Sequence, residues 1–163
     1  MALSVVVFDV GETLVDEEAA YERWEAEGLT AAPAFGDRDL HADALPCIDA
    51  LRALGLRVGA AGNMRAVHED FLRSHVDFAG SSEQWGVEKP AAGFFERIVE
   101  EAGAPAGAIL YVGDRVDNDV VPALAAGLRA VRIRRGAHAE IESPAGTVTI
   151  DSLVELPEAI ERV

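Results

Sequence analysis

Short apolar segments alternate with helix-like segments along most of the chain, and this alternation restricts the fold more than any other feature. The expected strands are residues 5–8, 56–61, 76–79, 109–112, 130–133 and 148–150. The expected helices are residues 17–27, 46–54, 67–72, 91–102, 120–126 and 157–163. Strands separated by helices are joined by right-handed crossovers in a parallel sheet. We therefore predict an α/β fold, a three-layer doubly wound parallel sheet with helices on both faces.

Composition indicates a single domain over residues 1–163, because half of the residues are hydrophobic and can form a sizeable core. The formal net charge of −15 repels phosphate backbones and anionic lipids, which argues against nucleic-acid binding and a membrane-surface role. The first apolar run is too short for a signal peptide or a membrane span. The single cysteine, Cys47, cannot form an internal disulfide, so we expect a cytoplasmic location.

Polar side chains follow the expected strands at the points where these strands end. Asp9 follows the first strand, Asn63 the second and Asp114 the fourth, with Asp119 shortly after it. Parallel sheets bind ligands beyond the carboxyl ends of their strands, so we expect these side chains to meet. Converging carboxylates repel one another unless some are protonated or a cation lies among them, and oxygen ligands favour Mg²⁺. Helix capping is the competing explanation, and it is the one we favour for Asp117.

Lys89 is the only lysine of the chain, beside 13 arginines. It lies immediately before Pro90, at the entry to the helix expected over residues 91–102. An ammonium group is a compact charge with three donors and can bridge a carboxylate and a phosphoryl oxygen, which a planar guanidinium does less readily. We therefore interpret Lys89 as a site residue rather than as a solvent-facing loop lysine.

Residues 82–134 contain Gly-Val-Glu-Lys-Pro, then Tyr-Val-Gly-Asp followed by Asn-Asp, then Ala-Gly-Leu. This set of sequence motifs resembles that of the haloacid dehalogenase (HAD) superfamily, whose members are mostly Mg²⁺-dependent phosphatases and phosphotransferases. The resemblance covers nearly the whole chain. It implies a HAD-like Rossmannoid core in which Asp9 is the nucleophile and forms an aspartyl-phosphate. It also implies that Mg²⁺ is held by Asp9, the backbone carbonyl of Gly11, Asp114 and Asp119, while Lys89 neutralises charge on the nucleophile and the transferring group.

Two motifs depart from the HAD pattern. The usual first motif reads Asp-x-Asp-Gly-Thr, and its second Asp protonates the leaving alcohol, whereas this chain has Gly11 and then Glu12. Either Glu12 replaces that acid, or the substrates have leaving groups that need no proton, or the site binds without turnover. The second motif has Gly62 where the family has Ser or Thr, so Asn63 and Thr13 are the expected substrate-binding side chains.

Residues 16–44 form a short insert where similar HAD members carry a helical cap domain. One helix and a loop are too small to fold as a separate lid with its own core. We therefore expect an open site, which would admit a phosphorylated macromolecule as well as a phosphorylated small molecule, or would be closed by a second subunit in a homodimer.

These features together predict a HAD-like, Mg²⁺-dependent phosphomonoesterase that is slow because of Gly11 and Gly62. The alternative is a catalytically impaired HAD-fold module that binds a phosphorylated ligand or protein, and a dehalogenase-like hydrolase is less favoured. Arg132, Arg134 and Arg135 could steer an anion, but alternating charges are more typical of an edge strand, which is the interpretation we favour. The four histidines are expected at the surface or in loops.

Overall fold

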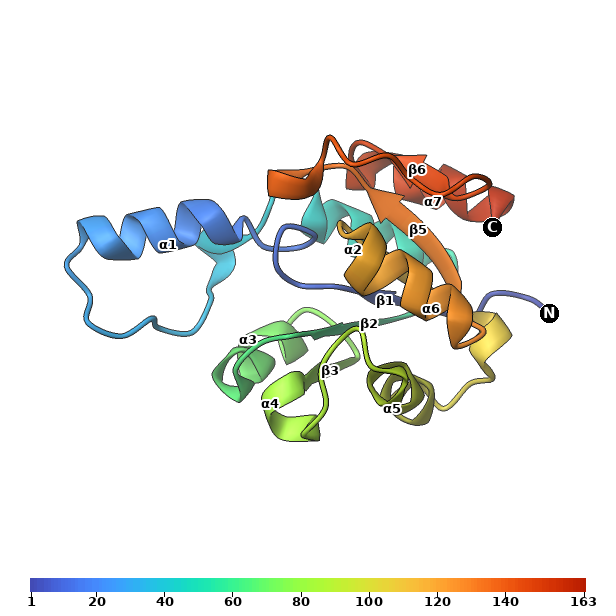
Figure 1. Cartoon of the computed structure of the whole chain (residues 1–163), viewed down its shortest axis with the longest axis horizontal. Coiled ribbons are helices and arrows are strands. Elements are labelled where there is room, and N and C mark those ends of the chain that lie inside the picture. The colour runs from blue at the N-terminus through green and yellow to red at the C-terminus, as the bar shows by residue number, and fades with distance from the viewer.

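The computed structural model describes residues 1–163 and contains one six-stranded sheet in the order β3-β2-β1-β4-β5-β6 (Figure 1). The strands are β1 (Val5–Phe8), β2 (Arg57–Gly62), β3 (Phe78–Ser81), β4 (Ile109–Gly113), β5 (Arg129–Ile133) and β6 (Val148–Ile150), and every neighbouring pair is parallel. The chain builds outward from β1 through β2 and β3, then crosses to the other side of β1 with β4. This doubly wound order confirms the predicted α/β fold.

Helices cover both faces of the sheet. They are α1 (Glu17–Ala26), α2 (Ala44–Ala53), α3 (Glu69–Arg73), α4 (Ser82–Trp85), α5 (Ala92–Ala102), α6 (Val121–Ala125) and α7 (Leu156–Ala159). Buried residues of α2, α3 and α7 share one hydrophobic core, and buried residues of α5 and α6 share the other. A π-helical turn, Val116–Val120, leads directly into α6. None of the helices combines the length and the apolar composition that crossing a lipid bilayer requires.

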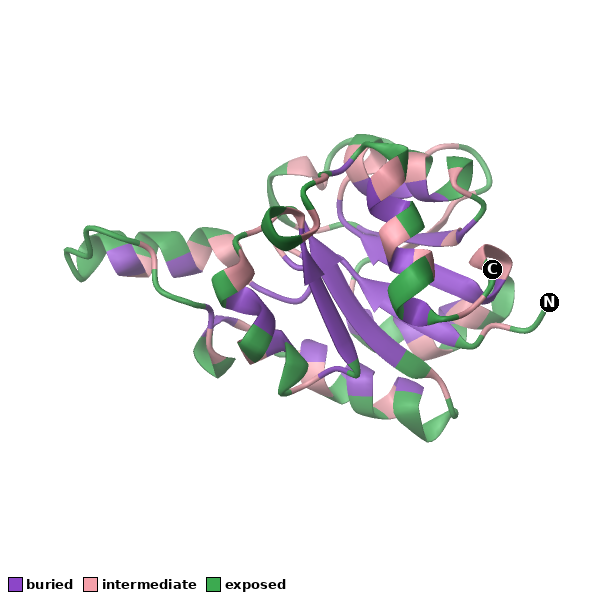
Figure 2. Ribbon diagram, turned by 90° about the horizontal axis from the view of Figure 1, so that it is seen from below, coloured by how far each residue is buried: buried purple, intermediate pink, exposed green.

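Successive side chains of the central strand enter opposite cores. Val6 and Phe8 of β1 belong to the core that includes α2 and α7, whereas Val5 and Val7 belong to the core that includes α5 and α6. All four are buried, and Figure 2 shows buried residues running along the strands between the helices. A continuous β-branched and aromatic run is what a strand covered on both faces requires.

The insert at residues 16–44 consists of α1, a short 3-10 turn and connecting loops, and α1 projects beyond the sheet (Figures 1 and 2). Trp24 of α1 stacks on Phe35 with ring centroids 5.6 Å apart, and Phe35 stacks on His68 at 4.1 Å. The Phe35 N–H also donates to His68 Nδ1 at 3.1 Å. This stack ties the insert to the segment after β2, and it corrects the expectation for His68, which is buried rather than at the surface.

Element boundaries differ from the expected ones by one or a few residues. α2 begins at Ala44, so Pro46 lies within its first turn. The pattern predicts that Val67 faces inward with Leu72, but Val67 is exposed because residues 66–68 form a separate 3-10 turn before α3. The last helix is the short α7, followed by a 3-10 turn over Ile160–Arg162.

The edge-strand interpretation of Arg132 is wrong. β6 pairs with β5, so β5 is an interior strand and Arg132 is fully buried. Its guanidinium donates to the carbonyl of His138 at 2.7 Å and to Ser143 Oγ at 3.0 Å, and it also bonds the carbonyl of Ile141. Arg132 therefore anchors the loop that follows β5, mainly through hydrogen bonds from its guanidinium to the backbone carbonyls of that loop.

Replacing Arg132 by Met is expected to lower the free energy of unfolding by about 1.5–3 kcal/mol, because the loop carbonyls lose charged donors. Urea denaturation measures this change. The matched control is Arg134→Met, since Arg134 pairs with Asp151 in solvent and such exposed pairs contribute little to stability. Equal losses in the two variants would contradict the structural role of Arg132.

Candidate active site

The strand register brings the predicted acids to one edge of the sheet. Phe8 pairs with Ala60 of β2 and with Val112 of β4, so Asp9 emerges beside Gly113 and Asp114. Single carboxylate oxygens of Asp9, Asp114 and Asp119 lie within 4.8 Å of one another, and all three residues are buried. The first two follow β1 and β4, and the third comes from the π-helical turn before α6.

Lys89 lies among these acids. Its Nζ donates to Asp9 Oδ1 and to Asp119 Oδ1, each at 2.6 Å. The side chain is 4 % exposed, and its ammonium lies 5.9 Å from the ring centre of Phe94 and 5.6 Å from that of Tyr111. A buried ammonium with two short carboxylate contacts holds Asp9 and Asp119 in fixed positions.

Burial and crowding shift the pKa values of the acids. Burial, with further contributions from Asp9 and Asp119, raises the pKa of Asp114 to about 9. Burial and the charge of Asp9 raise the pKa of Asp119 to about 6, although Lys89 opposes the shift. Burial disfavours the charged form of Lys89, yet the charge of Asp9 and the other neighbours outweighs it and holds the Lys89 pKa well above its usual range.

Three carboxyl groups beside one ammonium can all be ionised only if a further cation lies among them, and a divalent cation would balance that charge. Hard carboxylate oxygens at this spacing are the ligands that Mg²⁺ prefers. Gly11 lines the same cavity, of about 250 Å³, as Asp9, Asp114 and Asp119. The donor set therefore fits the ion that the sequence predicts.

Asn63 positions the lysine loop. Its Oδ1 accepts the backbone N–H of Lys89 at 2.7 Å, and its Nδ2 donates to the Lys89 carbonyl at 3.0 Å. Thr13, the other expected substrate-binding residue, is fully buried with Oγ1 3.5 Å from Asp9 Oδ2. In this structure both side chains contact the candidate catalytic residues, Asn63 through the backbone of Lys89 and Thr13 beside the carboxylate of Asp9.

The turn after β4 fixes Asp119. Asp119 Oδ2 accepts the backbone N–H of Arg115 at 2.9 Å. A side chain at Gly113 would collide with the Asp119 carboxyl, whose nearest atoms would lie about 2.4 Å from a Cβ, so glycine is needed here. Asp117 is exposed, is not part of the carboxylate cluster and pairs with Arg115, with Oδ2 2.8 Å from the guanidinium.

Comparison with known proteins identifies the family of the chain. A family model described as HAD-hydrolase-like matches residues 87–156. The chain is 32 % identical over 120 residues to a glyceraldehyde 3-phosphate phosphatase from Methanocaldococcus jannaschii, covering 69 % of this chain and 53 % of that protein. A protein of the same name from Methanopyrus kandleri is 35 % identical over 106 residues, covering 61 % of this chain and 46 % of that protein. The chain belongs to the HAD superfamily.

The fold agrees over a longer span than the sequence. The crystal structure of a HAD phosphatase from Thermococcus onnurineus matches with a TM-score of 0.75 at 20 % identity, covering 99 % of this chain and 100 % of that chain. The chain spans about half the length of the two curated HAD relatives described above.

Glu12 has an unusual backbone conformation for a non-glycine residue, with φ at 61°. The usual HAD motif places glycine at this position, where a left-handed conformation carries little strain, whereas glutamate costs about 1–2 kcal/mol. Glu12 Oε1 accepts the backbone N–H of Glu18 at 2.9 Å, and its side-chain carbons lie beside Gly136. Glu12 thus lies at the rim of the carboxylate cavity, bound to the first turn of α1.

Sequence reasoning missed Glu17. A Cβ built on Gly11 would overlap the Glu17 carboxyl, so the α1 side chain fills the space next to Gly11. Burial, together with the charges of Asp9 and Glu12, raises the pKa of Glu17 although the Tyr21 hydroxyl beside it opposes the shift. Nothing in the sequence distinguishes this residue from an ordinary acid in the first turn of a helix, where such acids are common.

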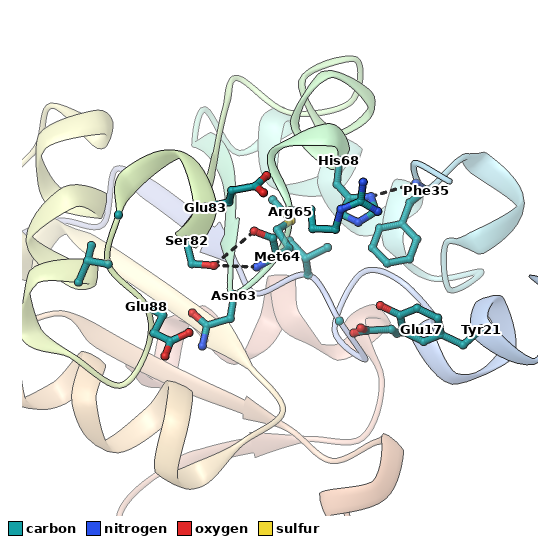
Figure 3. Close-up of a pocket in the computed structure, with 14 residues that line it drawn as sticks. Glu17, Tyr21, Phe35, Asn63, Met64, Arg65, His68, Ser82, Glu83 and Glu88 are labelled. Atoms are coloured by element: carbon teal, nitrogen blue, oxygen red, sulfur yellow. Dashed lines mark hydrogen bonds between the residues drawn. The ribbon is translucent and has the colours of Figure 1, made fainter. Parts of the chain in front are cut away.

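A second, larger cavity of about 660 Å³ adjoins the carboxylate cavity (Figure 3). The insert contributes Tyr21 and Phe35, the segment after β2 contributes Arg65 and His68, and Ser82, Glu83 and Glu88 line the opposite side. Gly11, Glu17 and Asn63 line both cavities. These three residues therefore mark the boundary between the acid cluster and the larger space.

Proposed function

We propose that the chain is a Mg²⁺-dependent phosphomonoesterase in which Asp9 forms an aspartyl-phosphate. The main support for this proposal is the position of the buried Lys89 Nζ, which lies 2.6 Å from Asp9 Oδ1 and 2.6 Å from Asp119 Oδ1. The carboxyl group of Asp114 lies next to these two carboxylates. The phosphatase names of the two curated relatives support it.

The reaction has two halves. A carboxylate oxygen of Asp9 attacks phosphorus, the bond from phosphorus to the ester oxygen breaks, and the alcohol leaves with the bonding electrons. Water then attacks the phosphorus of the aspartyl-phosphate, the bond to Asp9 breaks, and inorganic phosphate leaves. Lys89 reduces the negative charge that the incoming phosphate meets and that develops during transfer.

The metal would be held by Asp9, Asp114, Asp119 and the backbone carbonyl of Gly11. A bound Mg²⁺ would supply positive charge at the phosphoryl oxygens, the largest electrostatic requirement of phosphoryl transfer. Asp114 and Asp119 would be charge-bearing ligands of the ion, and the hydrogen bond from Arg115 N–H orients Asp119.

The proposed substrate is a small cytoplasmic phosphate monoester, with its organic part in the cavity of about 660 Å³. That volume lies in the range of small-molecule sites. Tyr21, Phe35 and His68 offer aromatic surface there, and Arg65 a positive charge. The net charge of −15 disfavours nucleic acid and membrane lipids as substrates.

Removing the metal is expected to lower phosphate release from para-nitrophenyl phosphate by at least about 10²-fold, because the ion contributes several kcal/mol to transition-state stabilisation. The measurement compares protein dialysed against a chelator with the same protein after Mg²⁺ is restored. Far-ultraviolet circular dichroism on both samples controls for unfolding.

The same assay separates the enzyme from a binding module. Absence of phosphate release with Mg²⁺, together with binding of beryllofluoride at the site, would favour the impaired module and contradict the proposal. Activity that is unchanged by chelation would contradict the metal assignment alone.

A further inference from the structure

The space beside Gly11, the position where the usual HAD motif has its second acid, is filled by a side chain from another segment. Gly11 has no positive φ, so its backbone conformation does not itself demand glycine. The obstacle to a side chain is the carboxyl of Glu17, whose Oε2 would overlap a Cβ at Gly11. A carboxyl group is therefore present where a side chain of residue 11 would begin, but α1 supplies it.

The position of this carboxyl relative to the two cavities indicates its role. Glu17 borders the cavity that holds Asp9, Lys89 and the other acids, and it also borders the larger cavity. A phosphate monoester with its phosphoryl group at Asp9 and its organic part in the larger cavity has its ester oxygen at this boundary. Figure 3 shows Glu17 and Tyr21 together on the α1 side, across the cavity from Asn63.

We propose that Glu17 is the general acid that protonates the leaving-group oxygen. This inference rests on the proposed phosphomonoesterase function and names the residue that the altered first motif leaves undetermined. Glu12 is less suited, because its carboxylate accepts the Glu18 N–H at 2.9 Å and its side-chain carbons lie beside Gly136 rather than in the space next to Gly11.

One carboxyl group is sufficient to balance the protons of the two half-reactions. In the first half, Glu17 gives its proton to the ester oxygen as the phosphorus–oxygen bond breaks, and the alcohol leaves neutral. In the second half, the Glu17 carboxylate takes a proton from the water that attacks the aspartyl-phosphate. Glu17 is then protonated again, and Asp9 is released as a carboxylate.

The test compares two esters in each variant. An aryl ester, para-nitrophenyl phosphate, leaves as a stable anion and needs little protonation, whereas an alkyl ester such as glycerol phosphate needs an acid. Glu17→Gln is expected to lower kcat/KM for the alkyl ester by about 10²–10⁴-fold and to leave the aryl ester much less affected. Glu18→Gln is the matched control, because Glu18 is the exposed neighbour in the same helical turn.

A further pair of variants distinguishes the loss of an acid from a folding defect. Glu17→Ala removes the carboxyl that obstructs residue 11, so adding Gly11→Asp should restore part of the alkyl-ester turnover that Glu17→Ala loses. Recovery in the double variant supports the assignment, because a merely structural defect would not be repaired by a second acid at residue 11.

The outcomes distinguish the two proposals. Turnover of neither ester by the wild-type protein overturns both the phosphomonoesterase function and the role of Glu17. Wild-type turnover with an unchanged alkyl-to-aryl ratio in Glu17→Gln overturns the role of Glu17 alone. The role of Glu17 is also overturned if the selective loss of alkyl-ester turnover occurs in Glu12→Gln and not in Glu17→Gln.

Discussion

Replacement of Asp9 by Asn is expected to reduce phosphate release by at least about 10⁴-fold, with aryl and alkyl esters affected alike. An amide oxygen is a far weaker nucleophile than a carboxylate, and no second carboxylate of the cluster continues from β1. Asp114 and Asp119 emerge after β4, and Asp119 is bound to Lys89 and to Arg115 N–H. Asp119 therefore cannot move into the place of Asp9 without losing these contacts.

A steady-state assay with para-nitrophenyl phosphate measures this loss, and mass spectrometry of acid-quenched wild-type protein should locate the transient phosphate on the peptide containing Asp9. The matched control is Asp117→Asn, since Asp117 is on the same rim but pairs only with Arg115 in solvent. Substantial turnover by Asp9→Asn, or a phosphate trapped on another residue, would contradict the nucleophile assignment.

The parts of the site that lie at strand ends could be predicted from the sequence. Apolar β-branched runs indicate strands, and parallel strands end at one edge of the sheet, so Asp9 and Asp114 had to be neighbours once the fold class was known. Lys89 could be found for a different reason, as the single lysine in a motif next to these acids. The sheet order makes β1 and β4 neighbours and so brings Asp9 and Asp114 together, and Lys89 reaches Asp9 from the segment before α5.

Residues whose surroundings come from distant segments could not be predicted. Glu17 is in the first turn of α1, where acids stabilise any helix, and only its contact with Gly11 sets it apart. Arg132 follows an alternating pattern that is typical of an exposed strand, but β6 and the loop at residues 136–143 cover it. The sequence around His68 does not distinguish it from a surface histidine, because it stacks on Phe35 of the insert, a residue 33 positions away in the chain.

Replacement of Lys89 by Met is expected to impair both stability and activity. Removing one partner of a buried charge pair leaves the other uncompensated, and the usual loss is about 3–5 kcal/mol of the free energy of unfolding. Here two carboxylates, those of Asp9 and Asp119, lose their ammonium at once. Denaturation in the absence of divalent cations measures the loss. Arg97→Met is the control, because Arg97 pairs with Glu100 and Glu101 at the surface.

Adding Mg²⁺ tests whether the lysine and the metal balance the same charge. If both act on the acid cluster, Mg²⁺ should stabilise Lys89→Met more than it stabilises the wild-type protein, because the variant has more uncompensated negative charge for the cation to neutralise. Equal stabilisation of the two proteins would contradict a shared charge balance and would indicate that the ion binds elsewhere.

Lys89→Arg separates the charge of the side chain from its shape. Arginine keeps the positive charge, but its planar guanidinium is larger than the ammonium that lies between two carboxylates and beside the rings of Phe94 and Tyr111. We expect Lys89→Arg to recover part of the stability lost in Lys89→Met and little of the phosphate release. Full recovery of turnover would mean that charge alone is sufficient, and it would leave the choice of lysine in a chain with 13 arginines without a chemical reason.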